Sequence, residues 1–161
     1  VYDENRNKTG ALHRRGDPLG PQEYHLVVEI WTLDGQGRVL LTRRDLRKHF
    51  GGLWECTGGS ALAGEDSRTA VRRELREETG AIAESWTPLG SLIASPGCYD
   101  EVLHLYLARG LTFGDTHPDE DEFLSVRRIP FQELVQRGLS GEIQDGKTVT
   151  AVLKAKLLLG L

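Results

Sequence analysis

Two periodicities of apolar positions run along the chain, and together they predict a mixture of strands and helices. Alternating or continuous runs of aliphatic, β-branched and aromatic residues predict strands at Tyr24–Leu33, Arg38–Arg43, Pro88–Ala94, Val102–Ala108 and Phe123–Arg128. The intervening Asp34–Gly37 indicates a hairpin turn between the first two strands. Leu53–Gly59 indicates a short strand that enters a loop. Helical spacing predicts helices at Asp66–Thr79, Pro130–Arg137 and Thr148–Leu159.

The order of these elements favours a single mixed α/β domain. Strands and helices follow one another without strict alternation, which suits a mixed sheet between helices. The chain has no repeat or linker, and its 161 residues, 39% of them hydrophobic, suit one domain over residues 1–161. We expect residues 1–22 to form an extension, with a turn at Glu4–Lys8 in a small hairpin and a loop at Pro18–Pro21.

Composition narrows the function classes without naming a reaction. A net charge of −4 argues against nonspecific binding to nucleic acid polymers or membranes. Cys56 and Cys98 have neither zinc-site spacing nor the pattern of a disulfide framework. Because the chain has no signal peptide and no apolar run that could cross a bilayer, we expect a reducing, cytoplasmic setting. The absence of an initiator Met suggests a natural start further upstream.

Three glutamates gather on one face of the helix predicted at Asp66–Thr79. At about 100° per residue, Glu74, Glu77 and Glu78 fall within an arc of roughly 100°. A solvated surface helix would interleave opposite charges four residues apart, whereas here the signs are sorted onto different faces. Close carboxylates repel one another unless a cation lies between them. This face therefore indicates a site for a divalent cation.

The residues around the glutamates describe a strand, a loop and a capped helix. Gly58 and Gly59 end the preceding strand, where the missing Cβ lets backbone carbonyls approach a bound ion or phosphate. Asp66 or Ser67 suits the N-cap, and Gly80 suits the residue after the helix. An apolar stripe holds the helix against the core and consists of Ala70, Val71 and Leu75.

This segment resembles the signature of the Nudix hydrolase superfamily. The signature reads Gly, five residues, Glu, seven residues, then Arg-Glu-aliphatic-any-Glu-Glu-any-Gly-aliphatic. Residues 59–81 match it at Gly59, Glu65, Arg73, Glu74, Leu75, Glu77, Glu78 and Gly80. Ala81 is a weak aliphatic residue at the last position. The resemblance implies the fold class α/β, as a Nudix-type α/β/α sandwich with a mixed β-sheet.

The resemblance also implies metal-dependent hydrolysis of a small-molecule diphosphate by attack of water at phosphorus. Carried over, the metal ligands are Glu74, Glu77, Glu78 and the Gly59 carbonyl. Glu77, Glu78 or a later loop glutamate such as Glu101 would orient or deprotonate the water. Arg73 would hold the carboxylates by ion pairing, and Glu65 would anchor the loop. Oxygen-only ligands suit Mg²⁺, with Mn²⁺ as the other candidate.

A narrower resemblance concerns the branch that contains type I isopentenyl diphosphate isomerase. It rests on VYDENRNKTGALHRR, EYHLVVEIW, RVLLTRRD and FGGLWECT. That isomerase moves a proton with a Cys and a Glu and holds a metal with His and Glu. Glu101 matches its later glutamate and His25 one of its metal histidines, while His13 matches another with changed spacing.

Departures from the isomerase pattern favour hydrolysis. Its cysteine falls on Gly58, the next histidine on Ser60, and a further acidic ligand on Tyr99. Cys56 is near the cysteine position without matching it, and a buried small residue is the preferred interpretation. The glutamate set needed for hydrolysis is complete. Isomerisation and ligand binding without cleavage stay open as alternatives, as do the substrate and the oligomeric state, for which a homodimer is one option.

Overall fold

The computed structural model describes residues 1–5, 7–14, 17–94, 102–115 and 125–161. Its strands are β1 (Val27–Leu33), β2 (Arg38–Arg43), β3 (Trp54–Glu55), β4 (Thr57–Ser60), β5 (Ala81–Ile93), β6 (Val102–Phe113) and β7 (Ser125–Pro130). Its helices are α1 (Ser67–Thr79), α2 (Phe131–Leu139) and α3 (Gly146–Leu159). Within the described residues, none of these helices has the length and apolar character needed to span a membrane.

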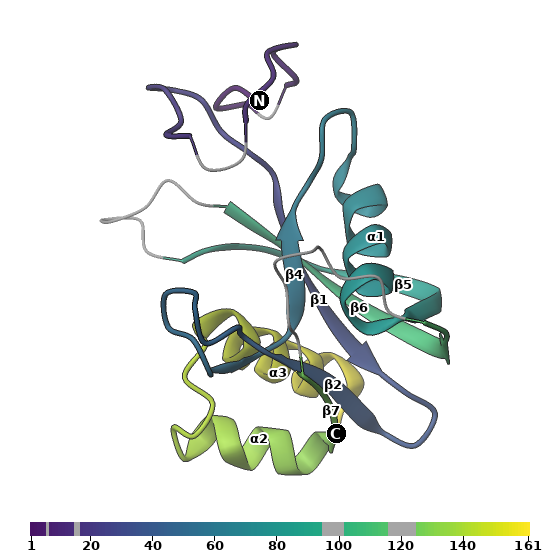
Figure 1. Cartoon of the computed structure of the whole chain (residues 1–161). Coiled ribbons are helices and arrows are strands. Elements are labelled where there is room, and N and C mark those ends of the chain that lie inside the picture. The colour runs from purple at the N-terminus through teal and green to yellow at the C-terminus, as the bar shows by residue number, and fades with distance from the viewer. Residues whose placement is uncertain (6, 15–16, 95–101, 116–124) are drawn as a thin grey trace.

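A mixed sheet with helices on both faces organises the molecule. Its strand order is β4-β1-β6-β5, in which β1 and β6 run parallel and the other neighbours antiparallel. Val28 and Ile30 of β1 face a core formed with α1, whereas Trp31 faces a second core formed with α2 and α3. Figure 1 shows α1 and the α2–α3 pair on opposite sides of the central strands. The predicted α/β/α arrangement with a mixed sheet is confirmed.

The turn at residues 34–37 does not join two paired strands, which corrects the predicted hairpin. Asp34 N donates to Arg38 O at 2.9 Å and closes the turn, but β2 pairs with β3 and β7 in a separate antiparallel sheet. Beyond the turn, Leu40 N donates to the side chain of Thr32 at 2.8 Å. A side-chain hydroxyl thus satisfies a backbone group where the two strands diverge.

The strand predicted at Leu53–Gly59 is in fact two strands in different sheets. Trp54–Glu55 pairs with β2, and Thr57–Ser60 pairs with β1. Cys56 lies at the crossing, where its backbone N–H donates to Thr148 Oγ1 at 2.8 Å. The chain therefore passes from one sheet to the other within this short segment, which brings Gly58 and Gly59 beside β1.

Other element boundaries differ from the predictions at their ends. The strand predicted from Pro88 begins at Ala81, and Pro88 is accommodated because β5 is at the edge of the sheet order. Helix α3 begins two residues earlier than predicted, with Asp145 as its N-cap. Pro130 ends β7 and caps α2 rather than starting the helix. The first residues of the strand predicted at Phe123–Arg128 lie outside the described residues.

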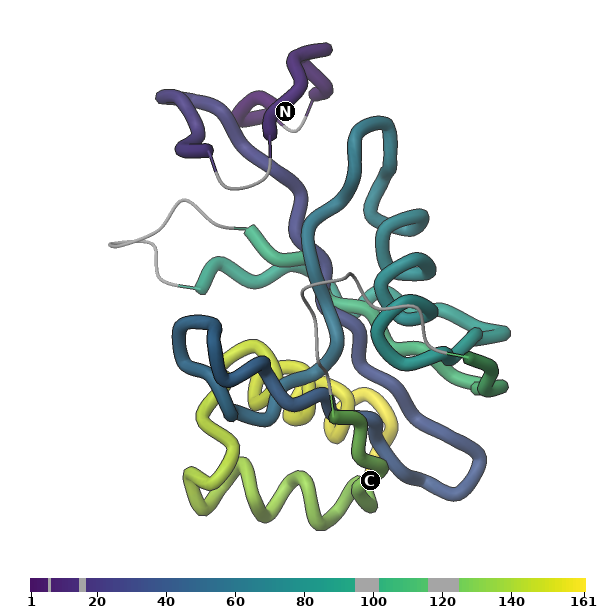
Figure 2. The backbone as a smooth tube through the Cα atoms, in the orientation of Figure 1, coloured from purple at the N-terminus to yellow at the C-terminus, as the bar shows by residue number. Residues whose placement is uncertain are grey.

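The N-terminal residues contact the loop that precedes α1. Tyr2 forms a bridge with Lys8, as a small hairpin requires, and a second bridge with Tyr24. Lys8 Nζ donates to Gly64 O at 2.8 Å. Figure 2 shows this N-terminal stretch, in purple, beside the tip of the β4–α1 loop. Segments that are far apart in sequence therefore meet at this end of the sheet.

Candidate active site

Helix α1 presents its glutamates on the side that faces strand β4. Asp66 caps the helix by accepting from Thr69 N at 2.8 Å, and Gly80 ends it in the left-handed conformation at φ 67°. Its apolar stripe is buried against the sheet and consists of Ala70, Val71 and Leu75. With that stripe fixed, the three predicted glutamates, Glu74, Glu77 and Glu78, all line one cavity.

Arg73 connects the acidic helix to the loop before it. Its guanidinium contacts Glu65 at 2.9 Å, Glu74 at 3.0 Å and Glu77 at 2.9 Å, and it donates to Ser60 O at 2.9 Å. Burial alone would lower the pKa of Arg73, but these carboxylates raise it. Burial likewise opposes the effect of Arg73 on Glu65, whose pKa is lowered overall. Arg73 therefore stays charged and links Glu74 and Glu77 of the helix to Glu65 of the loop.

The two glycines of β4 face opposite sides of the strand. A Cβ on Gly59 would collide with the Glu74 carboxylate, whereas one on Gly58 would collide with Val28 O and lie 2.6 Å from Glu29 Oε2. Beside them, the Thr57 hydroxyl is hydrogen-bonded to the Glu78 carboxylate. Residue 59 therefore has to be small because Glu74 packs directly on the backbone of β4.

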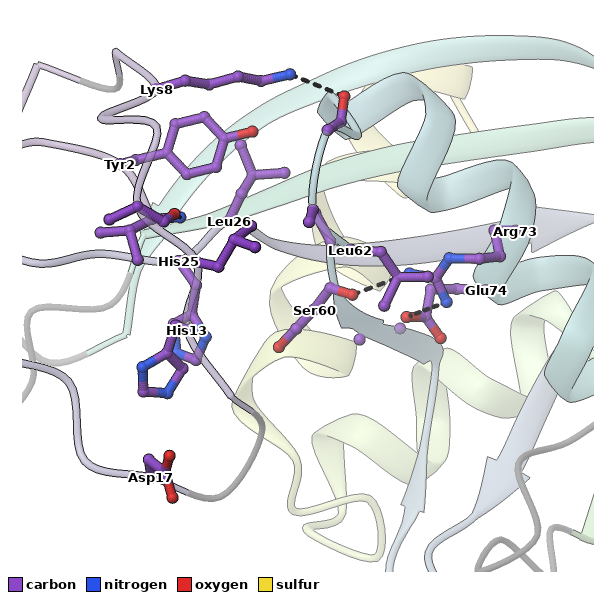
Figure 3. A pocket seen from close by; sticks show the side chains of 18 of the residues that line it. Tyr2, Lys8, His13, Asp17, His25, Leu26, Ser60, Leu62, Arg73 and Glu74 are labelled. Atoms are coloured by element: carbon purple, nitrogen blue, oxygen red, sulfur yellow. Dashed lines mark hydrogen bonds and ion pairs between the residues drawn. The ribbon is translucent and has the colours of Figure 1, made fainter.

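The cavity between the acidic helix and the N-terminal segment measures about 560 Å³. Its inner wall comprises Arg73, the three glutamates and residues 58–64, and its outer wall includes Tyr2, Lys8, His13, Asp17 and His25. Figure 3 shows His13 and Asp17 across the open space from Arg73 and Glu74. Such a volume lies within the range of roughly 300–1,000 Å³ that is common for ligand sites.

The acidic face has the donor chemistry that Mg²⁺ requires. Three carboxylates and the backbone of Gly59 border the same cavity, and hard oxygen donors are what Mg²⁺ prefers. In the described residues, no three acidic, histidine or cysteine side chains converge as they stand on one point. Arg73 pairs with Glu74 and Glu77, and Thr57 pairs with Glu78, so side-chain rotation would accompany metal binding.

Some predicted residues lie away from this cavity or outside the described part of the chain. Glu101, the candidate loop glutamate, lies outside the described residues, as do Cys98 and Tyr99. Cys56 is 2% exposed and packs in the core on the α3 side of the sheet. Burial raises the pKa of its thiol. The preferred interpretation of Cys56 as a buried small residue is confirmed.

Sequence reasoning missed much of the outer wall. Lys8 and Asp17 belong to the segment predicted as an N-terminal extension, and the sequence predicted no site role for either of them. Tertiary contacts with the β4–α1 loop and with Tyr24 bring this segment to the cavity. The isomerase-like spacing did single out His13 and His25, which both line the cavity with ring centroids 6.1 Å apart.

A comparison with known protein families shows to which family this chain belongs. The sequence model of the NUDIX domain matches residues 23–152. The chain belongs to the NUDIX domain family. The fold is similar to that of a solved structure of an ADP compounds hydrolase, which superposes on this NUDIX chain with a TM-score of 0.71. That match has 21% identity and covers 83% of this chain and 73% of the other.

Two similar proteins are named after different activities. An ADP-ribose pyrophosphatase of Mycobacterium tuberculosis is 32% identical over 81% of this chain and 65% of its own length. An isopentenyl-diphosphate Delta-isomerase of Mycolicibacterium vanbaalenii is 34% identical over 76% of this chain and 68% of its own length. Both resemblances found in the sequence, to the hydrolases and to the isomerase branch, are therefore confirmed as similarities.

Proposed function

We propose that this NUDIX chain is a Mg²⁺-dependent hydrolase that cleaves the diphosphate linkage of a small organic molecule, of the nucleoside-diphosphate type or another. The observation that carries the proposal is the acidic face of α1 with Arg73, placed at the wall of a cavity of ligand size. The relative named an ADP-ribose pyrophosphatase supports cleavage of a phosphoric anhydride bond.

The chain supplies the positioning for this reaction. Glu74, Glu77, Glu78 and the Gly59 carbonyl would hold the metal. When bound, Mg²⁺ would neutralise diphosphate charge and polarise the bond that breaks. Arg73 fixes Glu74 and Glu77 through its ion pairs, while Glu65 ties the loop to the same guanidinium. Glu77, whose side chain is 36% exposed, would orient or deprotonate the attacking water, and Glu78 and Glu101 are the other candidates for that role.

The test is hydrolysis of a panel by the wild type and by Glu77→Gln and Glu78→Gln. The panel contains ADP-ribose, GDP-mannose, a nucleoside triphosphate and isopentenyl diphosphate, each with and without Mg²⁺. We expect Mg²⁺-dependent cleavage by the wild type and a loss of roughly 10²–10⁴-fold in kcat for each variant. Glu133→Gln, on the exposed side of α2, is the matched control. A well-folded Glu77→Gln or Glu78→Gln enzyme with full activity would disprove the proposal.

The relative named an isomerase makes double-bond migration a second candidate. Among the described residues, no cysteine lines the cavity, and Cys56 lies buried on the other side of the sheet. We therefore expect no dimethylallyl diphosphate when the enzyme is incubated with isopentenyl diphosphate and Mg²⁺. Appearance of that isomer would replace the hydrolase proposal. Saturable binding of panel compounds without release of any phosphate would instead identify a ligand-binding module.

A further inference from the structure

Most of the outer wall of the cavity comes from a part of the chain that the family match does not cover; His25 is the member of that wall that lies within the match. The NUDIX match begins at residue 23, whereas Tyr2, Lys8, His13 and Asp17 line the cavity from residues before it. The acids and Arg73 all lie within the match. The groups proposed to act on the diphosphate thus lie within the family match, and most of the opposite wall lies before it.

Hydrogen bonds fix the first part of this wall, at Tyr2 and Lys8, relative to the acids. Tyr2 Oη donates to Glu65 O and Lys8 Nζ donates to Gly64 O, both at 2.8 Å. Tyr2 also exchanges backbone hydrogen bonds with Tyr24 at 2.8 and 3.0 Å. Because the side chain of Glu65 also pairs with Arg73, a short path of contacts joins the segment to the acidic helix. The start of the N-terminal segment is therefore anchored beside the acids, and His13 and Asp17 follow it along the chain and line the same cavity.

The position of the acids determines where the rest of a substrate has to lie. With its diphosphate against the face of α1, the organic group extends into the remaining cavity, toward the N-terminal wall shown in Figure 3. His13 and Asp17 border that space from one side and Ser60 from the other, and apolar residues, among them Leu12, Leu26 and Leu62, line it as well. The hydroxyl groups of a sugar both donate and accept hydrogen bonds and can satisfy the polar side chains, while its ring carbons can pack on the apolar ones. A purely apolar chain would desolvate the polar side chains without compensation.

We propose that His13 is a specificity-determining residue that binds the hydroxyl-bearing group, a ribose or other sugar, attached to the diphosphate. This inference rests on the proposed function. It adds a recognition role for the N-terminal segment, which lies outside the family match. His13 contacts the part of the substrate that does not react, so its removal weakens binding without changing the chemical step.

The experiment compares the wild type, His13→Ala and His13→Gln in steady-state hydrolysis of ADP-ribose with Mg²⁺. Inorganic diphosphate, which lacks an organic group, is measured in parallel as a competitive inhibitor. We expect His13→Ala to raise KM for ADP-ribose roughly tenfold, with little change in kcat and in the inhibition constant of inorganic diphosphate. His13→Gln, which keeps a hydrogen-bonding side chain, should recover part of the loss. His49→Ala, an exposed histidine that does not line the cavity, is the matched control.

The outcomes separate this inference from the proposed function. Wild-type enzyme that cleaves no panel compound fails the proposed function and this inference with it. Suppose instead that the wild type cleaves ADP-ribose. If His13→Ala then leaves KM unchanged, or weakens inhibition by inorganic diphosphate as much as it raises KM, the proposed function stands and the role of His13 is disproved. Preferential cleavage of isopentenyl diphosphate would also overturn the assignment to a hydroxyl-bearing group. Circular dichroism melting of each variant establishes that it is folded.

Discussion

Two adjacent glycines, at positions 58 and 59, meet very different neighbours. A side chain at 58 would collide with a backbone oxygen, Val28 O, which cannot move without distorting β1. A side chain at 59 would collide with the carboxylate of Glu74, which is the end of a flexible side chain. The first restriction concerns the stability of the sheet, and the second concerns the position of a candidate metal ligand.

Alanine substitutions should separate these two effects. We expect Gly58→Ala to lower the free energy of unfolding by about 1–3 kcal/mol because a methyl group is forced into close packing. Gly59→Ala should change it by less than about 1 kcal/mol but reduce Mg²⁺-dependent kcat/KM by roughly 10²-fold, since Glu74 is displaced. Gly35→Ala is the control, because its added Cβ meets nothing within 4 Å. Urea denaturation measures the free energy of unfolding, and steady-state kinetics measures kcat/KM. Unchanged activity in Gly59→Ala would contradict the proposed role of Glu74.

Strand β1 carries a carboxylate that faces away from the acidic helix. Glu29 is 3% exposed, and its Oε1 has no hydrogen-bond partner among the described residues. Burial raises the pKa of Glu29 well above 4.5; the charge of Lys147 on α3 opposes this effect, while Asp145, Glu55 and Glu78 add to it. Lys147 also pairs with Asp145 at 2.9 Å. Glu29 is thus a buried group that prefers its neutral form.

This burial predicts a pH dependence of stability. Because the folded state binds the Glu29 proton more tightly than the unfolded state, its contribution is present below pH 4.5 and is lost as the pH rises toward the folded pKa. The loss is at most about 1.4 kcal/mol per pH unit. We therefore expect the stability of Glu29→Gln, relative to wild type, to increase with pH above pH 4.5.

The measurement is urea denaturation of both proteins at several pH values from 4.5 to 8. Glu84→Gln, at an exposed position of β5, serves as the control, and its stability difference from wild type should stay nearly constant. A constant difference for Glu29→Gln as well would show that Glu29 ionises as readily in the folded as in the unfolded chain.

Two hydrophobic cores that share one sheet are found among the residues that the structure describes. The core toward α1 contains Val28, Ile30 and Leu75, and the core toward α2 and α3 contains Trp31 and Leu134. Because side chains of the same strand, β1, enter both cores, loss of packing on one face disturbs the strand that supports the other. We infer that the two cores unfold together.

Truncations in the two cores test this coupling. Leu75→Ala and Leu134→Ala remove fully buried side chains, and each should lower the free energy of unfolding by about 2–5 kcal/mol. Leu157→Ala, at a side chain that is 84% exposed, should change it by less than about 0.5 kcal/mol. In every variant, tryptophan fluorescence and far-ultraviolet circular dichroism should give coincident transitions. Two separated transitions in either core variant would show that the cores unfold independently.

The sequence by itself determined the features that depend on neighbouring residues. Helix α1 follows from its apolar stripe, the Asp66 cap and Gly80, and these residues also set the glutamates on one face. The spacing of those glutamates with Gly59 and Arg73 was enough to indicate the family. Local periodicity and capping act over a few residues, so they can be read without knowing the rest of the fold.

Only the tertiary structure decided which distant segments meet. The turn at residues 34–37 predicted a paired hairpin, but β1 and β2 join different sheets because each finds its partners elsewhere in the chain. The same holds for the split at Cys56 and for the N-terminal wall, which depends on hydrogen bonds to residues 64 and 65. Strand partners and cavity walls result from contacts between remote residues, and local sequence patterns do not encode them.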